Sequence, residues 1–340
     1  MENPSTSTRK ATNLRAFRNP VASTLPESAA SGYNRNRRHA RNAMGAVTTT
    51  DTAQLNLLDL DSPLQGKVRG ERSIMDYPLF SLAKKPQTEP QHYEIEGISI
   101  EIRPSGGGIA TMYDKEIVLY AISHINARHR RGERVDNTVV FAAHDFFRAT
   151  GVSRPSKRDY DRFQEALGRL QGTQIKTNIR TGNAGSKGWF SWFSEAVSTT
   201  RRMPDGSDQL EFVKVILCEW LYRAITRDRE IYQYHDDYFR LSLYERRLYE
   251  LAHCYAREDE HEMPIERFAQ KIGSSATIKK LKNTLKEIEA EDRIPEYRVE
   301  LRDIIEDQPA IDSLGRKRQK VRSVVVMRPR KSDTTPALAA

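Results

Sequence analysis

The stretch Glu262–Arg302, EMPIERFAQKIGSSATIKKLKNTLKEIEAEDRIPEYRVELR, decides the fold that we expect for this chain. Its first part predicts a short helix. Pro264 suits a first helical turn, because proline lacks only an N–H that would be unpaired there. Apolar residues then recur at helical spacing as far as Ile272, and Gly273 can end the helix in the left-handed conformation.

A second, longer helix is expected after the glycine. Ser274 and Ser275 are good N-cap residues, and an apolar stripe follows them. Two helices joined by a glycine-containing turn predict a helix-turn-helix. Alternating apolar and charged residues from Tyr297 onward predict a strand, which would make the unit a winged helix. An ordinary helical hairpin with a solvated lysine face is an equally good interpretation of this stretch alone. The lysines that lie off the apolar stripe are Lys279, Lys280, Lys282 and Lys286.

Composition limits the remaining possibilities. The chain has 340 residues and a formal net charge of +9, which allows two domains plus tails and favours a polyanionic partner. No run approaches the ~18 apolar residues needed to cross a bilayer, and the N-terminus lacks the apolar segment of a secretory signal. Cys218 and Cys254 are the only cysteines, so neither a disulfide framework nor a zinc site is expected. We therefore expect a cytoplasmic protein with no membrane partner and no metal or other cofactor.

Residues 1–75 are expected to form a disordered, basic N-terminal arm, because they are rich in Ser, Thr, Asn, Pro and Arg. One segment interrupts its polar character. Gln54, Leu55, Asn56, Leu57 and Leu58 resemble the pentapeptide with which bacterial proteins bind the sliding clamp, a short apolar anchor that fills a groove on its partner. That pattern prefers Phe where this chain has Leu58, and Ser or Asp where it has Asn56. A chance match is the alternative.

A second helix-turn-helix is predicted earlier in the chain. A short helix ends at Gly151, and a longer helix opens with Ser, Arg, Lys and Tyr, which suits contact with phosphates at a helix N-terminus. A strand over residues 175–179 and a returning strand over 189–199 would form a wing, with residues 181–188 as its tip. The tyrosine-rich stretch 232–239 could stack on single-stranded bases, although packing at a domain junction is the preferred interpretation.

The same order of elements therefore occurs twice, which indicates internal duplication. The predicted fold class is α+β, with two tandem winged-helix domains behind a disordered basic arm. We place the first winged-helix domain at residues 76–205, the second at 206–330 and a disordered tail at 331–340. Two such domains on one chain could span successive major grooves of DNA.

Several blocks of this sequence together resemble the plasmid replication initiator protein A family. The blocks are YDKEIVLYAISHINARHRRG (113–132), DFFRATG (145–151), SKRDYDRFQEALGRLQGTQIKTNI (156–179), YFRLSLYERRLYELAHCYAR (238–257) and PIERFAQKIGSSATIKKLKNTLKEI (264–288). The resemblance implies binding of iteron repeats at a plasmid origin. It also implies opening of an AT-rich element, recruitment of the host initiator, the replicative helicase and the sliding clamp, and a monomer–dimer equilibrium.

Candidate contacts to double-stranded DNA follow from this interpretation. Arginine and asparagine would select bases, whereas lysine and serine would mainly hold phosphates. In the first unit they are Ser153, Arg154, Ser156, Lys157, Arg158, Tyr160 and Arg162. In the second they are Ser274, Ser275, Thr277, Lys279, Lys280, Lys282 and Asn283. Further candidates on wings or strands are Arg180, Lys187, Arg298 and Arg302.

Two other classes of function compete with this interpretation. A rolling-circle nickase would need a His-hydrophobe-His metal pair and a tyrosine nucleophile, but His235 is followed by two aspartates and His253 by Cys254. We therefore expect no enzymatic activity. A winged-helix transcriptional regulator is the closer rival, because it would use the same domain. The clamp-like peptide distinguishes the two, since a repressor has no use for Gln54 or Leu57.

Overall fold

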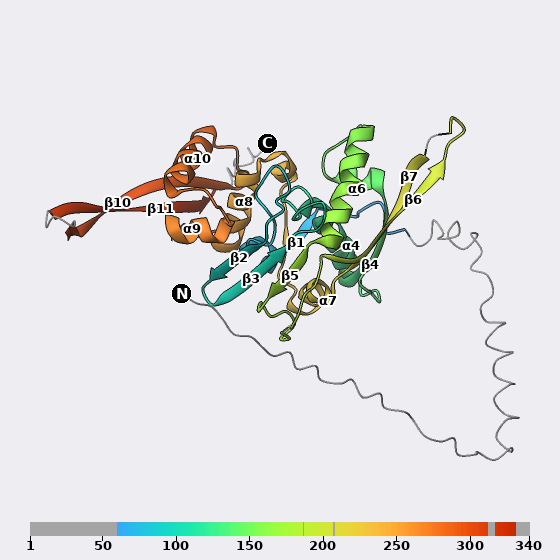
Figure 1. The fold of residues 1–340 in the computed structure, drawn as a ribbon, viewed down its shortest axis with the longest axis horizontal. Coiled ribbons are helices and arrows are strands. Elements are labelled where there is room, and N and C mark those ends of the chain that lie inside the picture. Colours follow the sequence, from blue (N-terminus) through green and yellow to red (C-terminus); the bar gives the residue numbers. More distant parts are fainter. Residues whose placement is uncertain (1–59, 186, 207, 312–316, 331–340) are drawn as a thin grey trace, which may run out of the picture. The chain divides into compact units, whose positions relative to one another are not determined.

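A computed structural model of the protein describes residues 60–185, 187–206, 208–311 and 317–330. The clamp-like peptide at residues 54–58, Ser186 and the expected tail at 331–340 lie outside the described residues. The fold is a mixture of helices and small antiparallel sheets, as the sequence predicted at that level (Figure 1). Within the described ranges, no helix is both long and apolar enough to cross a bilayer.

Short groups of strands and helices follow one another along the described chain. The helices are α3 (Arg72–Asp76), α4 (Lys115–Arg130), α5 (Ala143–Ala149), α6 (Lys157–Gly172), α7 (Glu219–Arg223), η2 (Ala224–Asp228), η3 (Asp236–Arg240), α8 (Leu243–Tyr255), α9 (Ile265–Ile272) and α10 (Ile278–Glu291). The strands are β1 (Arg69–Glu71), β2 (Gln91–Ile95), β3 (Ile98–Arg103), β4 (Thr138–Ala142), β5 (Gln174–Thr177), β6 (Phe193–Arg202), β7 (Asp208–Leu217), β8 (Ile231–Gln233), β9 (His261–Pro264), β10 (Tyr297–Ile311) and β11 (Lys317–Pro329).

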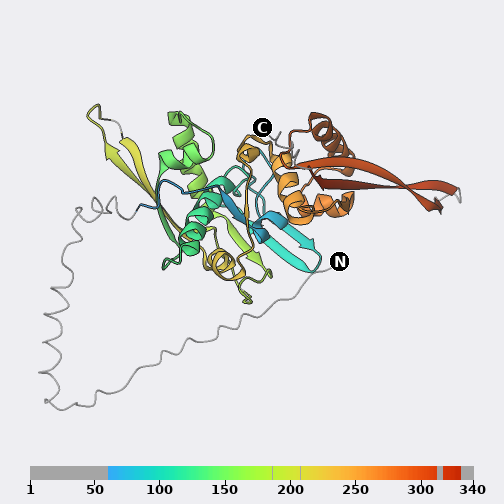
Figure 2. The same ribbon diagram turned by 180° about the vertical axis from the view of Figure 1, so that it is seen from behind.

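One arrangement of these elements occurs twice. The first unit consists of α4, β4, α5, α6 and the β6–β7 hairpin, and its sheet has the order β4-β7-β6. The second unit consists of α8, β9, α9, α10 and the β10–β11 hairpin, and its sheet has the order β9-β11-β10. In both units the last strand lies at the centre of the sheet. Figure 2 shows the β10–β11 hairpin extending well past α9 and α10.

The glycine that ends α9 lies where the sequence predicted, but α10 begins later than expected, because Thr277 caps it and not Ser274 or Ser275. Gly273 has φ +71° and ends α9, and the Thr277 side chain accepts a hydrogen bond from the N–H of Lys280 at the start of α10. Leu281 and Leu285 of α10 are buried against the sheet. In the first unit, Ser156 and Asp159 form a reciprocal capping box at the start of α6.

The predicted wing of the first unit is wrong in its strand pairing. β5 pairs with β3, so residue 175 meets the returning segment only at a single bridge to Phe190. The hairpin is instead β6–β7, with Arg202 opposite Asp208. The alternating apolar residues of β7 were assigned to the next domain, but they fill the centre of the first unit's sheet. The boundary expected between residues 205 and 206 therefore falls inside the turn of one hairpin.

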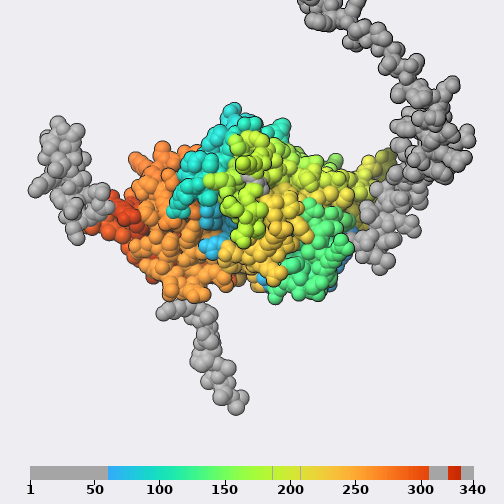
Figure 3. Space-filling model, turned by 90° about the horizontal axis from the view of Figure 1, so that it is seen from below, coloured from blue at the N-terminus to red at the C-terminus, as the bar shows by residue number. Residues whose placement is uncertain are grey.

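Two further segments differ from their expected structure. The folded region begins before residue 76: β1 and α3 lie within the expected arm, and Ile74 and Met75 are fully buried. In Figure 3 the blue segment near residue 70 lies among the cyan and orange parts of the surface. Strand β10 also continues through Pro309, although proline usually interrupts a strand. A shift in strand register between Glu306 and Ala310 accommodates the proline, which has no N–H to pair.

The tyrosine-rich stretch packs into the interior, as the preferred interpretation held. Tyr234 and Tyr238 are buried and meet edge to face, with ring centroids 4.5 Å apart. Tyr249 of α8 packs against both rings. A row of exposed rings for single-stranded bases is therefore not formed here, although Tyr232 stays half-buried at the surface.

Candidate nucleic-acid interface

Helix α10 presents a cationic surface opposite its buried stripe. Lys279, Lys280 and Lys286 are exposed, and none of them has an ion-pair partner among the described residues. Lys282 is half-buried and lies 3.6 Å from a carboxylate oxygen of Asp303 on the adjacent hairpin. Asn283 is exposed on the same helix. Three lysines are thus available to an outside anion.

Helix α6 has the same property at its start. Arg154, Lys157, Arg158 and Arg162 are exposed and form no ion pair with any described carboxylate. Because an N-terminal helix end carries a partial positive charge and unpaired N–H groups, cations placed there add to the attraction for a phosphate. Both units therefore present unpaired cations on the second helix of the pair.

Several predicted contacts are occupied within the protein. The Ser156 hydroxyl donates to Asp159 at 2.7 Å, and Thr277 caps α10. The Ser274 hydroxyl lies 3.2 Å from the Tyr244 hydroxyl, and Tyr160 packs edge to face against Phe147 at 4.9 Å. Ser153 and Ser275 remain exposed. These contacts position the helices, so the side chains free to meet DNA are mainly the arginines, the lysines and Asn283.

The predicted DNA contacts outside the helices are either paired with carboxylates or lie away from the hairpins. Arg298 lies 3.3 Å from Glu300 of the same strand, and Arg302 lies 2.6 Å from Glu262 of β9, so carboxylates of the same sheet partly neutralise both. Arg180 and Lys187 are exposed, but they lie in the loop between β5 and β6 and not on the β6–β7 hairpin. The β6–β7 hairpin carries two exposed arginines, Arg201 and Arg202, which were not among the predicted contacts because the wing was expected on other strands. They too have acidic neighbours, Glu211 and Asp208.

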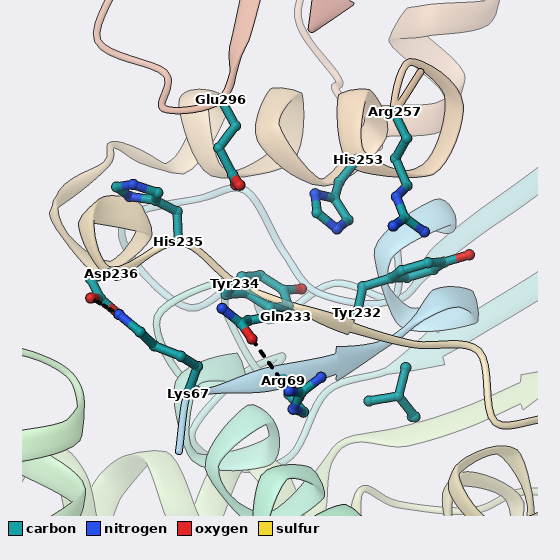
Figure 4. Close-up of a pocket in the computed structure, with 11 residues that line it drawn as sticks. Lys67, Arg69, Tyr232, Gln233, Tyr234, His235, Asp236, His253, Arg257 and Glu296 are labelled. Carbon is teal, nitrogen blue, oxygen red and sulfur yellow. Dashed lines mark hydrogen bonds and ion pairs between the residues drawn. The ribbon is translucent and has the colours of Figure 1, made fainter. Parts of the chain in front are cut away.

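A polar pocket of about 410 Å³ lies beside β8 and α8 (Figure 4). Its three cationic side chains all have partners within the protein. Lys67 pairs with Asp236, Arg69 donates to the Gln233 side chain at 3.3 Å, and Arg257 lies over the Tyr232 ring.

The two histidines that line this pocket both have hydrogen-bond partners within the protein. The ring of His253 hydrogen-bonds the Tyr297 hydroxyl at 2.9 Å, and burial lowers the pKa of His253. The His235 ring accepts from the N–H of Asp237. In the described part of the chain, no group of three or more His, Cys, Asp or Glu side chains is placed to hold a metal ion.

The most heavily buried charges were not predicted. Lys115, Glu250, Arg247 and Lys271 are all 0–1% exposed and lie where the two units meet. Charged residues on a surface helix are normally solvated, so no pattern in the sequence marked these four as interior. The only feature of the sequence that could have indicated their burial is the nearby tyrosines, because buried tyrosine hydroxyls need hydrogen-bond partners.

Comparisons with known proteins agree with a DNA-replication role. The model of the replication initiator protein A family matches residues 69–299. A putative replication protein of Wigglesworthia glossinidia brevipalpis is 30% identical over 235 residues, which are 68% of this chain and 84% of that protein. The crystal structure of domains 2 and 3 of RctB, determined from selenomethionine derivatives, matches with a TM-score of 0.50 at 14% identity. That match covers 74% of this chain and 95% of the RctB chain. The last similarity concerns the fold alone.

Proposed function

Because this chain belongs to the replication initiator protein A family, we propose that it binds iteron repeats in the double-stranded DNA of a plasmid origin through two winged-helix domains. The first unit and the second unit are these domains, and α6 and α10 are the helices that enter the major groove. The observation that supports this most directly is the set of unpaired cations on α6 and α10, in contrast to the paired arginines on the hairpins.

The side chains divide by chemistry. Arg154, Arg158 and Arg162 of the first unit can contact guanine in a bidentate manner, and Asn283 of the second can contact adenine. Lys157, Lys279 and Lys280 have single ammonium groups that suit phosphates. Loss of a base-contacting arginine should cost ~1–3 kcal/mol of discrimination between sequences, whereas loss of a phosphate lysine should weaken binding to all sequences alike.

The first test is binding of the full chain to its own plasmid's origin fragment and to a scrambled fragment over a salt series, with footprinting. We expect selective protection of regularly spaced direct repeats. The double variant Lys279→Ala/Lys280→Ala should lose the footprint of the second unit, and the slope of log affinity against log salt should fall by about 2. Lys84→Ala/Lys85→Ala is the matched control for the second unit, because it removes the same charge from exposed lysines outside α9 and α10.

Other results would contradict this proposal. Equal, steeply salt-sensitive binding to both fragments would mean that charge alone acts. Selective binding to one inverted repeat at a promoter, without direct repeats, would identify a transcriptional regulator. Sedimentation of the protein with and without iteron DNA would test the proposed monomer–dimer equilibrium.

We also propose that Gln54–Leu58 binds the bacterial sliding clamp. Residues directly after this peptide are attached to the first unit, since the N–H of Asp61 donates to Val140 at 2.7 Å and Ser62 accepts from the N–H of Ala142. A bound clamp would therefore be held close to the DNA. In a pull-down with purified clamp, Gln54→Ala/Leu57→Ala should abolish capture while origin binding is unchanged. Capture that survives this double change would contradict the proposal.

The protein is proposed to act by binding and not by catalysis, with the host initiator and the replicative helicase as further partners. Supercoiled plasmid carrying the origin should remain uncut when incubated with the protein and Mg²⁺ or Mn²⁺. Site-specific nicking under these conditions would show an enzyme.

A further inference from the structure

A buried ionic cluster joins the first unit to the second. The Lys115 ammonium of α4 lies 2.6 Å from one carboxylate oxygen of Glu250 in α8, and Arg247 lies 2.7 Å from the other. The hydroxyls of Tyr234 and Tyr238 donate to the same carboxylate at 3.0 and 2.8 Å. One buried carboxylate thus accepts from four groups that come from separate parts of the chain.

The cluster continues into α9 and α3. The Arg247 guanidinium also donates to the carbonyl of Met75 at 2.6 Å and to that of Lys271 at 2.7 Å. The ammonium of Lys271 lies 2.9 Å from Asp76, which accepts a further bond from Tyr255. Four helices, α3, α4, α8 and α9, are therefore tied together by charged groups with directional bonds.

Both members of the central pair are charged near neutral pH. Burial alone would raise the pKa of Glu250, but the charges and hydrogen bonds of Lys115 and Arg247 outweigh it and hold that pKa below its usual value. Burial lowers the pKa of Lys115 to about 8. Removing one charge would leave the other charges buried without a partner, which is strongly disfavoured.

A second set of contacts holds the turn in front of α10. Glu96, in the turn between β2 and β3, lies 2.5 Å from Arg267 and 3.5 Å from Lys271 of α9. At Gly273 an added Cβ would lie 2.6 Å from the Cβ of Pro78. The chain before the first unit therefore touches the turn from which the cationic helix of the second unit begins.

These contacts leave little freedom between the two units. A shift of the second unit relative to the first would pull Lys115 off Glu250, and a shift of α9 relative to the segment before the first unit would open the close contact at Gly273. Buried ion pairs contribute little net stability, but their geometry is specific. These contacts are therefore suited to fixing the position of the second unit relative to the first.

We propose that the contacts of Lys115, Arg247, Glu250 and Glu96, together called the junction, hold the two units at one distance and orientation. The junction would thereby fix the spacing of the two DNA sites that the protein binds at once. The inference rests on the proposed function, and its ligand is duplex DNA with two half-sites at one separation. Each inserted base pair would move one half-site by ~3.4 Å and rotate it by ~35°, which a rigid protein cannot follow. Glu250, Lys115, Arg247 and Glu96 are positioning residues in this scheme and touch no base.

The test measures binding of the full chain to the footprinted repeat with zero, one, two, five and ten base pairs inserted between its half-sites. We expect the wild-type affinity to drop at least tenfold with one or two inserted pairs. Insertion of ten pairs restores the rotation but not the distance, so affinity should stay low.

Two variants probe the junction. Glu96→Gln removes an exposed partner and should fold normally, and Glu250→Gln probes the buried cluster if it remains folded by circular dichroism. Each variant should reduce, several-fold, the ratio of the affinity for the native repeat to the affinity for the repeat with one inserted base pair. The affinity for the native repeat itself should change less. Glu94→Gln is the matched control, because Glu94 is an exposed neighbour on the same hairpin with no ion pair among the described residues. It should leave the ratio unchanged.

The outcomes separate the two proposals. The proposal that the junction fixes the spacing is contradicted if wild type binds all spacings equally well. It is also contradicted if Glu96→Gln and a folded Glu250→Gln keep the wild-type ratio of affinities for the native repeat and the repeat with one inserted base pair. In both cases the proposed origin binding stands. If wild type does not prefer its repeats to scrambled DNA, the proposed function itself fails.

Discussion

At the scale of single residues, Glu71 is a carboxyl buried without a cation among the described residues. It lies at the end of β1 and accepts a hydrogen bond from the N–H of Ile74 at 3.3 Å, which caps α3. Burial raises the pKa of Glu71 to about 7. His124 is the opposite case, since burial lowers the pKa of its imidazole to about 4.

Glu71 should make the protein less stable as pH rises. The folded state binds its proton more tightly than the unfolded state, in which the pKa is near 4.5, so stability is lost between about pH 4.5 and pH 7. The shift corresponds to about 3 kcal/mol of free energy of unfolding. Glu71→Gln keeps an acceptor for the cap and has no charge to bury. It should therefore be more stable than wild type at pH 8 and nearly equal at pH 4.5.

Urea unfolding from pH 4.5 to 8 measures this difference. Taking the variant minus wild type removes the contribution of His124, which has the opposite slope below pH 6.5. Glu94→Gln should show no such trend, because that carboxyl is exposed. A pH-independent difference for Glu71→Gln would show that the carboxyl is not buried as described.

At the scale of elements, the two helix pairs have similar turns in different surroundings. Gly151 follows α5 with φ +86° and has open space where a Cβ would lie. Gly273 follows α9 with φ +71°, but its Cβ would meet Pro78 at 2.6 Å and the Tyr93 hydroxyl at 3.2 Å. Only the second turn is pressed against another part of the protein.

Alanine at these two glycines should therefore differ in cost. Gly151→Ala should lose about 1 kcal/mol, the penalty of placing a Cβ in the left-handed conformation. Gly273→Ala should lose that amount plus about 1–3 kcal/mol for the clash, because proline at position 78 cannot rotate away. Chemical denaturation of both variants measures the difference. Equal losses would mean that the segment around Pro78 does not contact the turn in solution.

At the scale of the whole molecule, the junction makes the first and second units depend on each other. Contacts between α3 and α8, between α4 and α8, and between β2 and α9 cross it. Because Glu250 accepts from groups on both sides, neither unit can unfold alone without exposing the cluster. We expect a single cooperative transition.

Glu250→Ala should lower the free energy of unfolding by about 3–5 kcal/mol, because it leaves Lys115 and Arg247 buried without a counter-charge. Glu94→Ala, an exposed change on the β2–β3 hairpin, should stay within about 0.5 kcal/mol of wild type. Scanning calorimetry measures both the midpoint and the number of transitions. Two well-separated transitions in wild type would contradict the coupling.

Local patterns in the sequence determined the elements and their order. The apolar stripes of α4, α6, α9 and α10 and the glycine after α9 depend on neighbours within a few residues, so they could be predicted from the chain alone. The cap of α10 was predicted wrongly, because Ser274, Ser275 and Thr277 are all suitable cap residues and only the structure shows that Thr277 is the one used. The exposed lysines of α10 follow from the same periodicity, because a residue off a buried stripe must face outward. Several separated blocks also identified the family.

Only the tertiary structure decided which strands pair and which charges are buried. β5 and β7 have similar alternating patterns, and the choice of partner depends on contacts between residues far apart in the chain. Lys115 and Glu250 are 135 positions apart, and each is an ordinary surface residue by composition. Their burial is tolerated because folding brings the opposite charge and two tyrosine hydroxyls to the same point, an arrangement that no local pattern encodes.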